Sequence, residues 1–232
     1  TLDMLHADAA RPDASPCGSV TSGGTESILS ALLAYRERAR AERGIAVPQV
    51  ILPETAHVAF EKSAHLFGME VVQAPVDPVT TQVDVDFVRD RIGPRTAVVV
   101  GSACNYGYGT IDPIAELSSI ALERGIGLHV DGCLGGFILP WGEALGYDIP
   151  PFDFRLPGVT SMSCDTHTWG FGLKGTSVVL YRNRALRRRT YFATTTWAGG
   201  LDTSPTMAGG RSGGPTTGPV AVILAVGAQG GL

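Results

Sequence analysis

The stretch Ser161-Met-Ser-Cys-Asp165-Thr-His-Thr168-Trp-Gly-Phe-Gly-Leu-Lys174-Gly-Thr-Ser177-Val-Val-Leu-Tyr181 decides how the fold is interpreted. It predicts two short strands joined by a glycine-rich loop, and the second strand is apolar and β-branched, as buried strands are. The loop carries a carboxylate, an imidazole and an ammonium group within ten residues. Polar groups this dense between apolar strands either face a ligand or form a hydrogen-bonded loop at the sheet edge. Taken alone, the stretch favours neither interpretation.

Outward from this stretch, segments with strand periodicity alternate with segments of helical periodicity. The predicted strands are Gln49–Leu52, Glu70–Val76, Ala97–Ala103, Gly127–Asp131, Thr160–Ser163 and Ser177–Tyr181. The predicted helices are Glu26–Arg43 (with Gly44 as its stop), Ala56–Phe67, Val85–Ile92 and Pro113–Arg124. The alternation predicts a three-layer α/β domain, in which a mainly parallel sheet carries helices on both faces.

The composition limits the partners and the compartment. The 232 residues are 44% hydrophobic and 17% charged, which suffices for one large domain. A net charge of −4 argues against nucleic acid as a partner. The four cysteines form no CxxC pair and the histidines lack zinc-ligand spacing, so we expect no metal and free thiols in a reducing cytoplasm. The longest apolar run, Pro219–Ala228, is too short for a transmembrane segment.

The two ends and two further segments carry weaker signals. The chain begins with Thr1 and ends in an incomplete apolar pattern, Gly218–Leu232, so residues 1–232 are expected to be a fragment of a longer enzyme. The arginine cluster Arg187–Arg189 is interpreted as a surface turn. The Gly- and Thr-rich stretch Ala198–Gly218 is interpreted as a long ordered loop or an interface segment.

A glycine-rich motif, Gly18-Ser-Val-Thr-Ser-Gly-Gly24-Thr25-Glu-Ser27, stands directly before the first predicted helix. Glycines let the backbone approach an anion, and the helix start offers free N–H groups and a partial positive charge. Thr25 is expected to cap the helix and to lend its hydroxyl to a phosphate. The pattern nearly fits a nucleotide P-loop, but Gly24 stands where the lysine is required. A single phosphate group or a simple helix cap explains the motif equally well.

Two further side chains stand where ligands bind in α/β sheets. Asp131 ends a predicted strand and is followed by small residues that leave room for a flat ligand, although a strand-end Asp is commonly a turn former. His57 stands at a helix start, where a histidine is more often structural than catalytic. Together, a phosphate cradle, an Asp for a pyridine nitrogen and a His for a ring face describe a pyridoxal-phosphate site.

The motifs resemble those of the sphingosine-1-phosphate lyase family, in the group II decarboxylase branch of the fold-type I pyridoxal-phosphate enzymes. They are Cys17–Ser27, His129–Phe137, Pro151–Arg155, Gly158–Thr160, Asp165–His167, Lys174–Ser177 and Ser204–Gly209. They run in order over nearly the whole chain. The resemblance implies the large cofactor-binding domain, without the family's smaller C-terminal domain.

The resemblance also implies roles for individual residues. Gly24 and Thr25 would hold the phosphate of pyridoxal 5′-phosphate with His167 beside it, while His57 would stack on the ring and Asp131 would pair with its nitrogen. Ser204 would reach the phosphate in a neighbouring subunit, so a homodimer is expected. Lys174 would bind the phosphate of the substrate, a phosphorylated long-chain base, and Asn105 and Tyr106 would lie in a substrate-binding loop that borders the site. The implied reaction is a retro-aldol cleavage to a fatty aldehyde and phosphoethanolamine.

One position departs from the family pattern. The family has Asp-Thr-His-Lys, in which the lysine forms the Schiff base with the cofactor, whereas this chain has Asp165-Thr-His167-Thr168. A threonine has no amine and cannot form the Schiff base, so the sequence predicts that ordinary lyase turnover is lost. Whether the chain is an enzyme at all is left undecided. The alternatives are a non-catalytic or altered relative that binds the cofactor without a covalent link, and a P-loop-like nucleotide binder.

Overall fold

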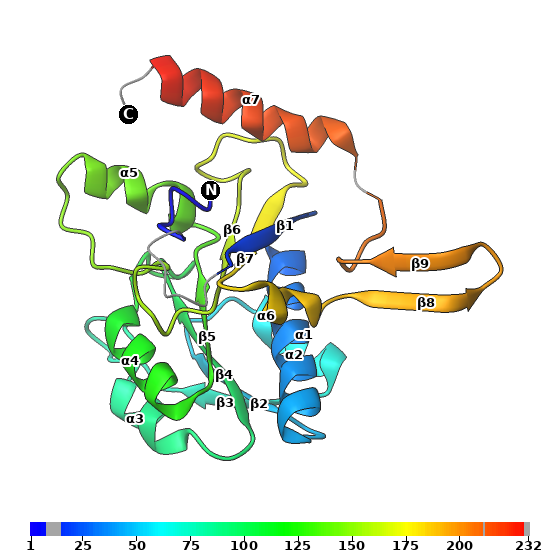
Figure 1. Cartoon of the computed structure of the whole chain (residues 1–232). Helices are drawn as coiled ribbons and strands as arrows, with labels where there is room; N and C mark the ends of the chain where they lie inside the picture. Colours follow the sequence, from blue (N-terminus) through cyan, green and yellow to red (C-terminus); the bar gives the residue numbers. More distant parts are fainter. Residues whose placement is uncertain (8–14, 211, 230–232) are drawn as a thin grey trace.

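A seven-stranded sheet forms the centre of the chain in the computed structural model, which describes residues 1–7, 15–210 and 212–229 (Figure 1). Its strands stand in the order β1-β7-β6-β5-β4-β2-β3. They are β1 (Cys17–Thr21), β2 (Gln49–Pro53), β3 (Glu70–Ala74), β4 (Thr96–Ser102), β5 (Gly127–Asp131), β6 (Ser161–Cys164) and β7 (Ser177–Tyr181). Strands β2 to β6 run parallel, while β7 runs antiparallel to both β6 and β1. The predicted mainly parallel sheet is therefore confirmed.

Helices cover both faces of the sheet and create two separate cores. They are α1 (Gly24–Arg43), α2 (Ala59–Phe67), α3 (Val85–Arg91), α4 (Ile114–Arg124), α5 (Leu139–Ala144), α6 (Arg184–Arg188) and α7 (Gly213–Gln229), with a 3₁₀ turn, η1, at Gly135–Phe137. Tyr35 of α1 and Phe60 of α2 belong to one apolar cluster, whereas Val88 of α3 and Leu117 of α4 belong to the other. The three-layer α/β architecture is confirmed.

The first helix ends as predicted but begins differently. Gly44 adopts the left-handed conformation, with φ of 64°, and its N–H bonds to Arg40 O at the end of α1. At the start, the N-cap is Gly23 and makes no side-chain capping bond, and instead Glu26 Oε2 accepts from Ser22 N at 2.7 Å. The prediction that Thr25 caps the helix was wrong, because Thr25 lies inside the first turn, past the position from which a side chain can cap.

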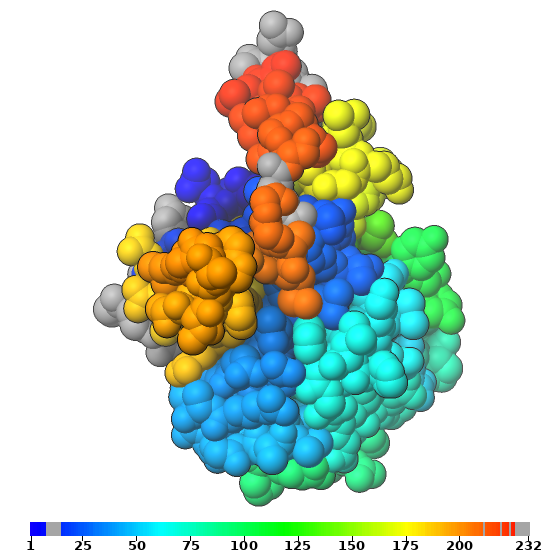
Figure 2. Space-filling view, turned by 90° about the vertical axis from the view of Figure 1, so that its right-hand side faces the viewer, coloured from blue at the N-terminus to red at the C-terminus, as the bar shows by residue number. Residues whose placement is uncertain are grey.

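Several elements lie where the sequence predicted a loop, a turn or no element at all. Strand β1 precedes α1, and the hairpin of β8 (Phe192–Trp197) with β9 (Gly200–Ser204) stands out from the sheet (Figure 1). Figure 2 shows the same hairpin from its tip, in orange. The predicted loop Ala198–Gly218 contains β9 and the start of α7, and the predicted turn at Arg187–Arg189 is largely α6. The residues of β8 are mostly exposed, so the hairpin has no buried face that could produce an alternating apolar pattern.

Among the helices within residues 1–7, 15–210 and 212–229, none combines the length and the apolar character that crossing a bilayer requires.

Candidate functional site

A cavity of about 590 Å³ opens where the carboxyl ends of β4 and β5 meet the start of α1 and the loop after β6. Ligands of open α/β sheets bind at this edge. The predicted residues that line it are Gly24, Thr25, His57, Tyr106, Asp131, His167, Thr168 and Lys174. The fold thus brings together residues that are up to 150 positions apart in the sequence, from Gly24 to Lys174.

Two predicted residues do not line this cavity. Asn105 is buried, and its Oδ1 accepts from Tyr108 N at 2.9 Å, so its side chain shapes the loop that carries Tyr106. Ser204 ends β9 and donates from Oγ to Thr206 O at 3.1 Å. The role expected of Ser204 requires a second copy of the chain.

The start of α1 forms a tightly packed edge of the cavity. A Cβ added at Gly24 would lie 2.9 Å from Asp165 Oδ2 and 2.9 Å from Cys133 Sγ. Only glycine therefore lets the backbone pack so closely against both side chains. The first turn of this 20-residue helix offers N–H groups and a partial positive charge to an anion in the cavity.

Asp131 lines the cavity at the end of β5, and two hydrogen bonds fix the orientation of its carboxylate. Its Oδ1 accepts hydrogen bonds from Ser163 Oγ at 3.0 Å and from Cys133 N at 3.1 Å. Its exposed fraction is only 6%. A carboxylate oriented in this way can pair with a protonated ring nitrogen of a flat ligand.

His57 lies just before α2, which begins three residues later than predicted. Its Nδ1 accepts from Ala59 N at 3.1 Å, so the neutral ring carries its proton on Nε2. The ring is exposed and meets Tyr106 edge to face, with 6.3 Å between the ring centroids. Both aromatic side chains are thus available to contact a ligand ring.

The loop after β6 adds a histidine and a carboxylate. His167 Nδ1 donates to Thr176 O at 2.6 Å, which directs Nε2 towards Asp165 Oδ2 at 3.6 Å. Burial raises the pKa of Asp165, while the nearby Ser177 hydroxyl and His167 oppose the rise. Asp165 Oδ1 is buried without a hydrogen-bond partner among the described residues.

One of the two lysines of the chain lines the cavity, and the other lies on the outer surface. Thr168 is half-buried and lines the cavity, and Lys174 lines the same cavity from the following loop. Lys62, the other lysine of the sequence, is exposed on α2 and does not line it. Lys174 therefore supplies the only lysine amine that lines this cavity.

The cysteines at the cavity have no thiolate character. Burial raises the pKa of the Cys104 thiol, and it raises that of Cys133 well above its usual value with help from Asp131 and Asp165. Both thiols are protonated at neutral pH and are poor nucleophiles. No cluster of three His, Cys, Asp or Glu side chains in the described part of the chain could hold a metal ion.

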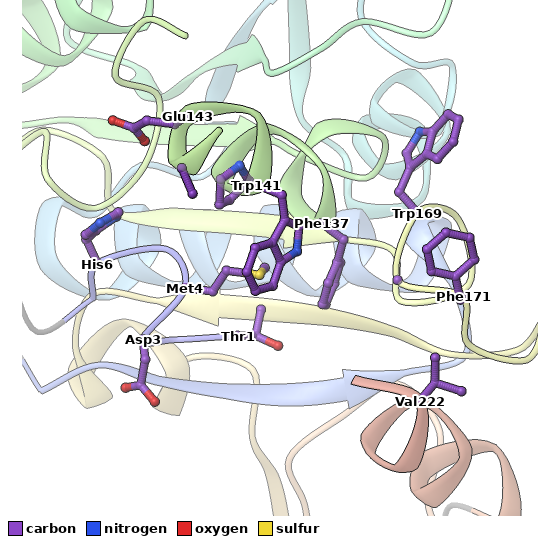
Figure 3. Close-up of a pocket in the computed structure, with 13 residues that line it drawn as sticks. Thr1, Asp3, Met4, His6, Phe137, Trp141, Glu143, Trp169, Phe171 and Val222 are labelled. Carbon is purple, nitrogen blue, oxygen red and sulfur yellow. The ribbon is translucent and has the colours of Figure 1, made fainter. Parts of the chain in front are cut away.

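A second cavity, of about 530 Å³, is bordered by residues 169–171 of the loop that follows Thr168 (Figure 3). Phe137, Trp141, Trp169 and Phe171 dominate its lining, and Val222 of α7 borders it. The lining also includes the carboxylates of Asp3 and Glu143, which would repel a phosphorylated ligand. We therefore assign the functional site to the first cavity, where the polar groups converge.

Sequence reasoning missed several contributors to the site. Cys104, Cys133 and Asp165 line the cavity but were given no role from the sequence. Asp165 stands in the Asp-Thr-His motif, and Cys133 follows Asp131 by two residues, so their positions were the available signal. The contact of Gly24 with both side chains had no sequence signal, because it joins three distant segments.

Comparison with known proteins places this chain in a family. Residues 2–194 match the family described as pyridoxal-dependent decarboxylase conserved domain. A sphingosine-1-phosphate lyase from Dictyostelium discoideum is 48% identical over 93% of this chain and 40% of its own length. The sphingosine-1-phosphate lyase of Saccharomyces cerevisiae is 46% identical over 94% of this chain and 37% of its own length.

Solved structures agree with this match. The sphingosine-1-phosphate lyase of Burkholderia pseudomallei K96243 superimposes with a TM-score of 0.96 at 57% identity, over 99% of this chain and 53% of that one. A glutamate decarboxylase from Lactobacillus brevis superimposes with a TM-score of 0.83 at 24% identity, over 99% of this chain and 53% of that one, which shows a shared fold. This chain therefore spans about half the length of that lyase and about 40% of the curated relatives.

Proposed function

Because the chain belongs to the pyridoxal-dependent decarboxylase family, we propose that it is the cofactor-binding large domain of a sphingosine-1-phosphate lyase. The cofactor of the family is pyridoxal 5′-phosphate. The substrate would be a phosphorylated long-chain base, cleaved to a fatty aldehyde and phosphoethanolamine. The observation that carries the proposal is the convergence of a helix start, His57, Asp131, His167 and Lys174 on one cavity.

The residues present fit non-covalent binding of the cofactor. The first turn of α1, with Gly24 and Thr25, suits the phosphate of the cofactor. His167 lines the same cavity. The buried carboxylate of Asp131 suits a protonated pyridine nitrogen, and the exposed ring of His57 suits the ring face. A covalent link at position 168 does not fit, because Thr168 has no amine.

The chemistry of each side chain at the cavity suggests its role in the proposed reaction. When bound, the cofactor supplies an electron sink for breaking the C2–C3 bond of the substrate. Asp131 keeps the ring nitrogen protonated, which maintains this capacity. Lys174, a flexible cation at the cavity, binds the substrate phosphate, and Tyr106 borders the entrance loop. The nucleotide-binding alternative is disfavoured, since Gly24 replaces the lysine that a P-loop requires.

We predict that the unmodified protein binds pyridoxal 5′-phosphate as the free aldehyde. Absorption spectra of the purified protein with the cofactor should show the free-aldehyde band, and borohydride should leave no cofactor attached to the chain. An Asp131→Ala variant is the control for binding in this cavity and should bind about tenfold more weakly. Failure of the unmodified protein to retain any cofactor after gel filtration at saturating concentration would contradict the proposal.

We also propose that the functional unit is a homodimer. The hairpin β8–β9 exposes Phe192, Trp197 and Leu201, and Ser204 at its end lies outside the cavity of its own chain. A second copy that covers this hairpin would bury these side chains and could bring its Ser204 towards the cofactor phosphate. Light scattering of the protein extended to the length of its relatives should give twice the monomer mass, and a stable monomer with full cofactor binding would argue against this proposal.

A further inference from the structure

A row of buried polar side chains leads from the core of the domain to Asp131. Asp131 and His129 are alternate residues of β5, and Ser163 and Ser161 are their partners in the parallel register with β6. His129 Nε2 lies 3.2 Å from Ser163 Oγ, and His129 Nδ1 lies 2.7 Å from Ser161 Oγ. Tyr35 OH of α1 lies 2.6 Å from Ser161 Oγ at the far end. All four of the supporting side chains are fully buried.

The direction of each hydrogen bond follows from counting protons. An ionised carboxylate only accepts hydrogen bonds, so the Ser163 hydroxyl donates its single proton to Asp131 Oδ1. Ser163 Oγ can then only accept, so His129 must carry a proton on Nε2. Burial lowers the pKa of His129 to about 4, so the ring is neutral and its Nδ1 accepts from Ser161. Ser161 in turn has only lone pairs left for Tyr35, whose hydroxyl also lies 2.7 Å from Thr160 Oγ1 and 3.3 Å from Leu128 O.

The fold also holds the row rigidly. The ring of Phe60 packs edge-on against His129, with 5.6 Å between the ring centroids. Tyr35 crosses β5 at Gly127, where an added Cβ would lie 2.2 Å from the tyrosine ring. Glycine at this position is what lets the Tyr35 hydroxyl reach Ser161. The O–H and N–H groups of Ser161, His129 and Ser163 therefore point along one path towards the same carboxylate oxygen.

We propose that His129 is a positioning residue that acts through Ser163 to orient the carboxylate of Asp131 and to stabilise its negative charge towards the cofactor ring. This role requires that His129 carry its proton on Nε2. In the other tautomer, Nε2 would only accept, and Ser163 Oγ would receive no hydrogen bond from the ring. The role of Asp131 rests on the proposed function, but the direction of the hydrogen bonds does not. Loss of the Ser163 donor would leave Asp131 with only the Cys133 N–H on Oδ1.

The tautomer can be measured on the protein without cofactor. In ¹⁵N-histidine-labelled protein at pH 7, the resonance that disappears in His129→Gln should have the shifts of a neutral ring protonated on Nε2. A ring protonated on Nδ1, or a charged ring, would overturn the proposal. If the chain retains no pyridoxal 5′-phosphate, the proposed function fails, while this measurement still decides the hydrogen-bond direction.

Cofactor binding then tests the consequence. Ser163→Ala and His129→Leu should each weaken pyridoxal 5′-phosphate binding about tenfold and shift the ¹⁵N resonance of its pyridine nitrogen towards the unprotonated value. His129→Gln, whose amide can still donate to Ser163, should recover most of both effects. Ser63→Ala is the matched control, because Ser63 is also fully buried but donates only to Ala59 O in its own helix. Equal affinity and equal pyridine shifts in His129→Leu and the unmodified protein would overturn the proposal.

Discussion

Replacing Thr168 with lysine is expected to convert a protein that holds pyridoxal 5′-phosphate non-covalently into one that links it covalently. Thr168 is half-buried at the cavity, and none of the described hydrogen bonds uses its side-chain hydroxyl. The substitution should therefore disturb little packing while adding an amine next to His167. The readout is an absorption band of the lysine-linked cofactor and, after borohydride reduction, a mass increment on the peptide that contains residue 168.

The same substitution should also raise turnover. A lysine at this position provides a proton-transfer group beside the reacting atoms, and such groups contribute on the order of 10²–10⁴-fold. Cleavage of a phosphorylated long-chain base should rise by this order in Thr168→Lys, measured on the protein extended to the length of its relatives.

Two lysine substitutions serve as controls for Thr168→Lys. Adding Lys174→Ala should preserve the covalent link and weaken substrate binding, while adding Lys62→Ala should change neither, because Lys62 lies outside the cavity. A borohydride-stable adduct at Lys174 in the unmodified protein would contradict the assignment of Lys174 to the substrate phosphate.

Gly24→Ala is expected to weaken binding of the cofactor strongly. Gly24 lines the same cavity as Thr168, at the start of α1. The new Cβ would lie 2.9 Å from both Asp165 Oδ2 and Cys133 Sγ, so one of these side chains or the start of α1 must move. Overpacking of this kind costs about 1–3 kcal/mol, and the displaced helix start would misalign its N–H groups. The dissociation constant of pyridoxal 5′-phosphate, measured by fluorescence quenching, should rise about 10- to 100-fold.

A double-mutant cycle separates this clash from a general loss of stability. Cys133→Ala truncates to its Cβ one of the two side chains that the new Cβ meets, so the double variant should recover part of the lost affinity. Gly93→Ala is the matched control, because a Cβ there has no heavy atom within 4 Å. Unchanged affinity in Gly24→Ala would show that close packing at this glycine does not set the cofactor position.

Local patterns were sufficient for the strands buried within the sheet and for the helices that pack against it. The predicted bounds of Val85–Ile92 and Gly127–Asp131 nearly match the observed ones, because a helix packed on the sheet shows helical periodicity and a fully buried strand is a short, largely apolar run. The β8–β9 hairpin escaped prediction, since its residues stay exposed and carry no such periodicity. The start of α1 was misjudged at Thr25 because Glu26, rather than the expected hydroxyl, bonds the preceding loop.

For the site, the sequence by itself determined which chemical groups are available, including the carboxylate of Asp131, the ring of His57 and the missing amine at Thr168. These are properties of residue types in motifs, and they need no coordinates. Only the tertiary structure decided that Gly24 packs on Asp165 and Cys133, and that His129 and Ser163 support Asp131. The physical reason is that strand register and helix packing create these contacts between segments distant in sequence, and no local periodicity encodes the distance between two particular atoms.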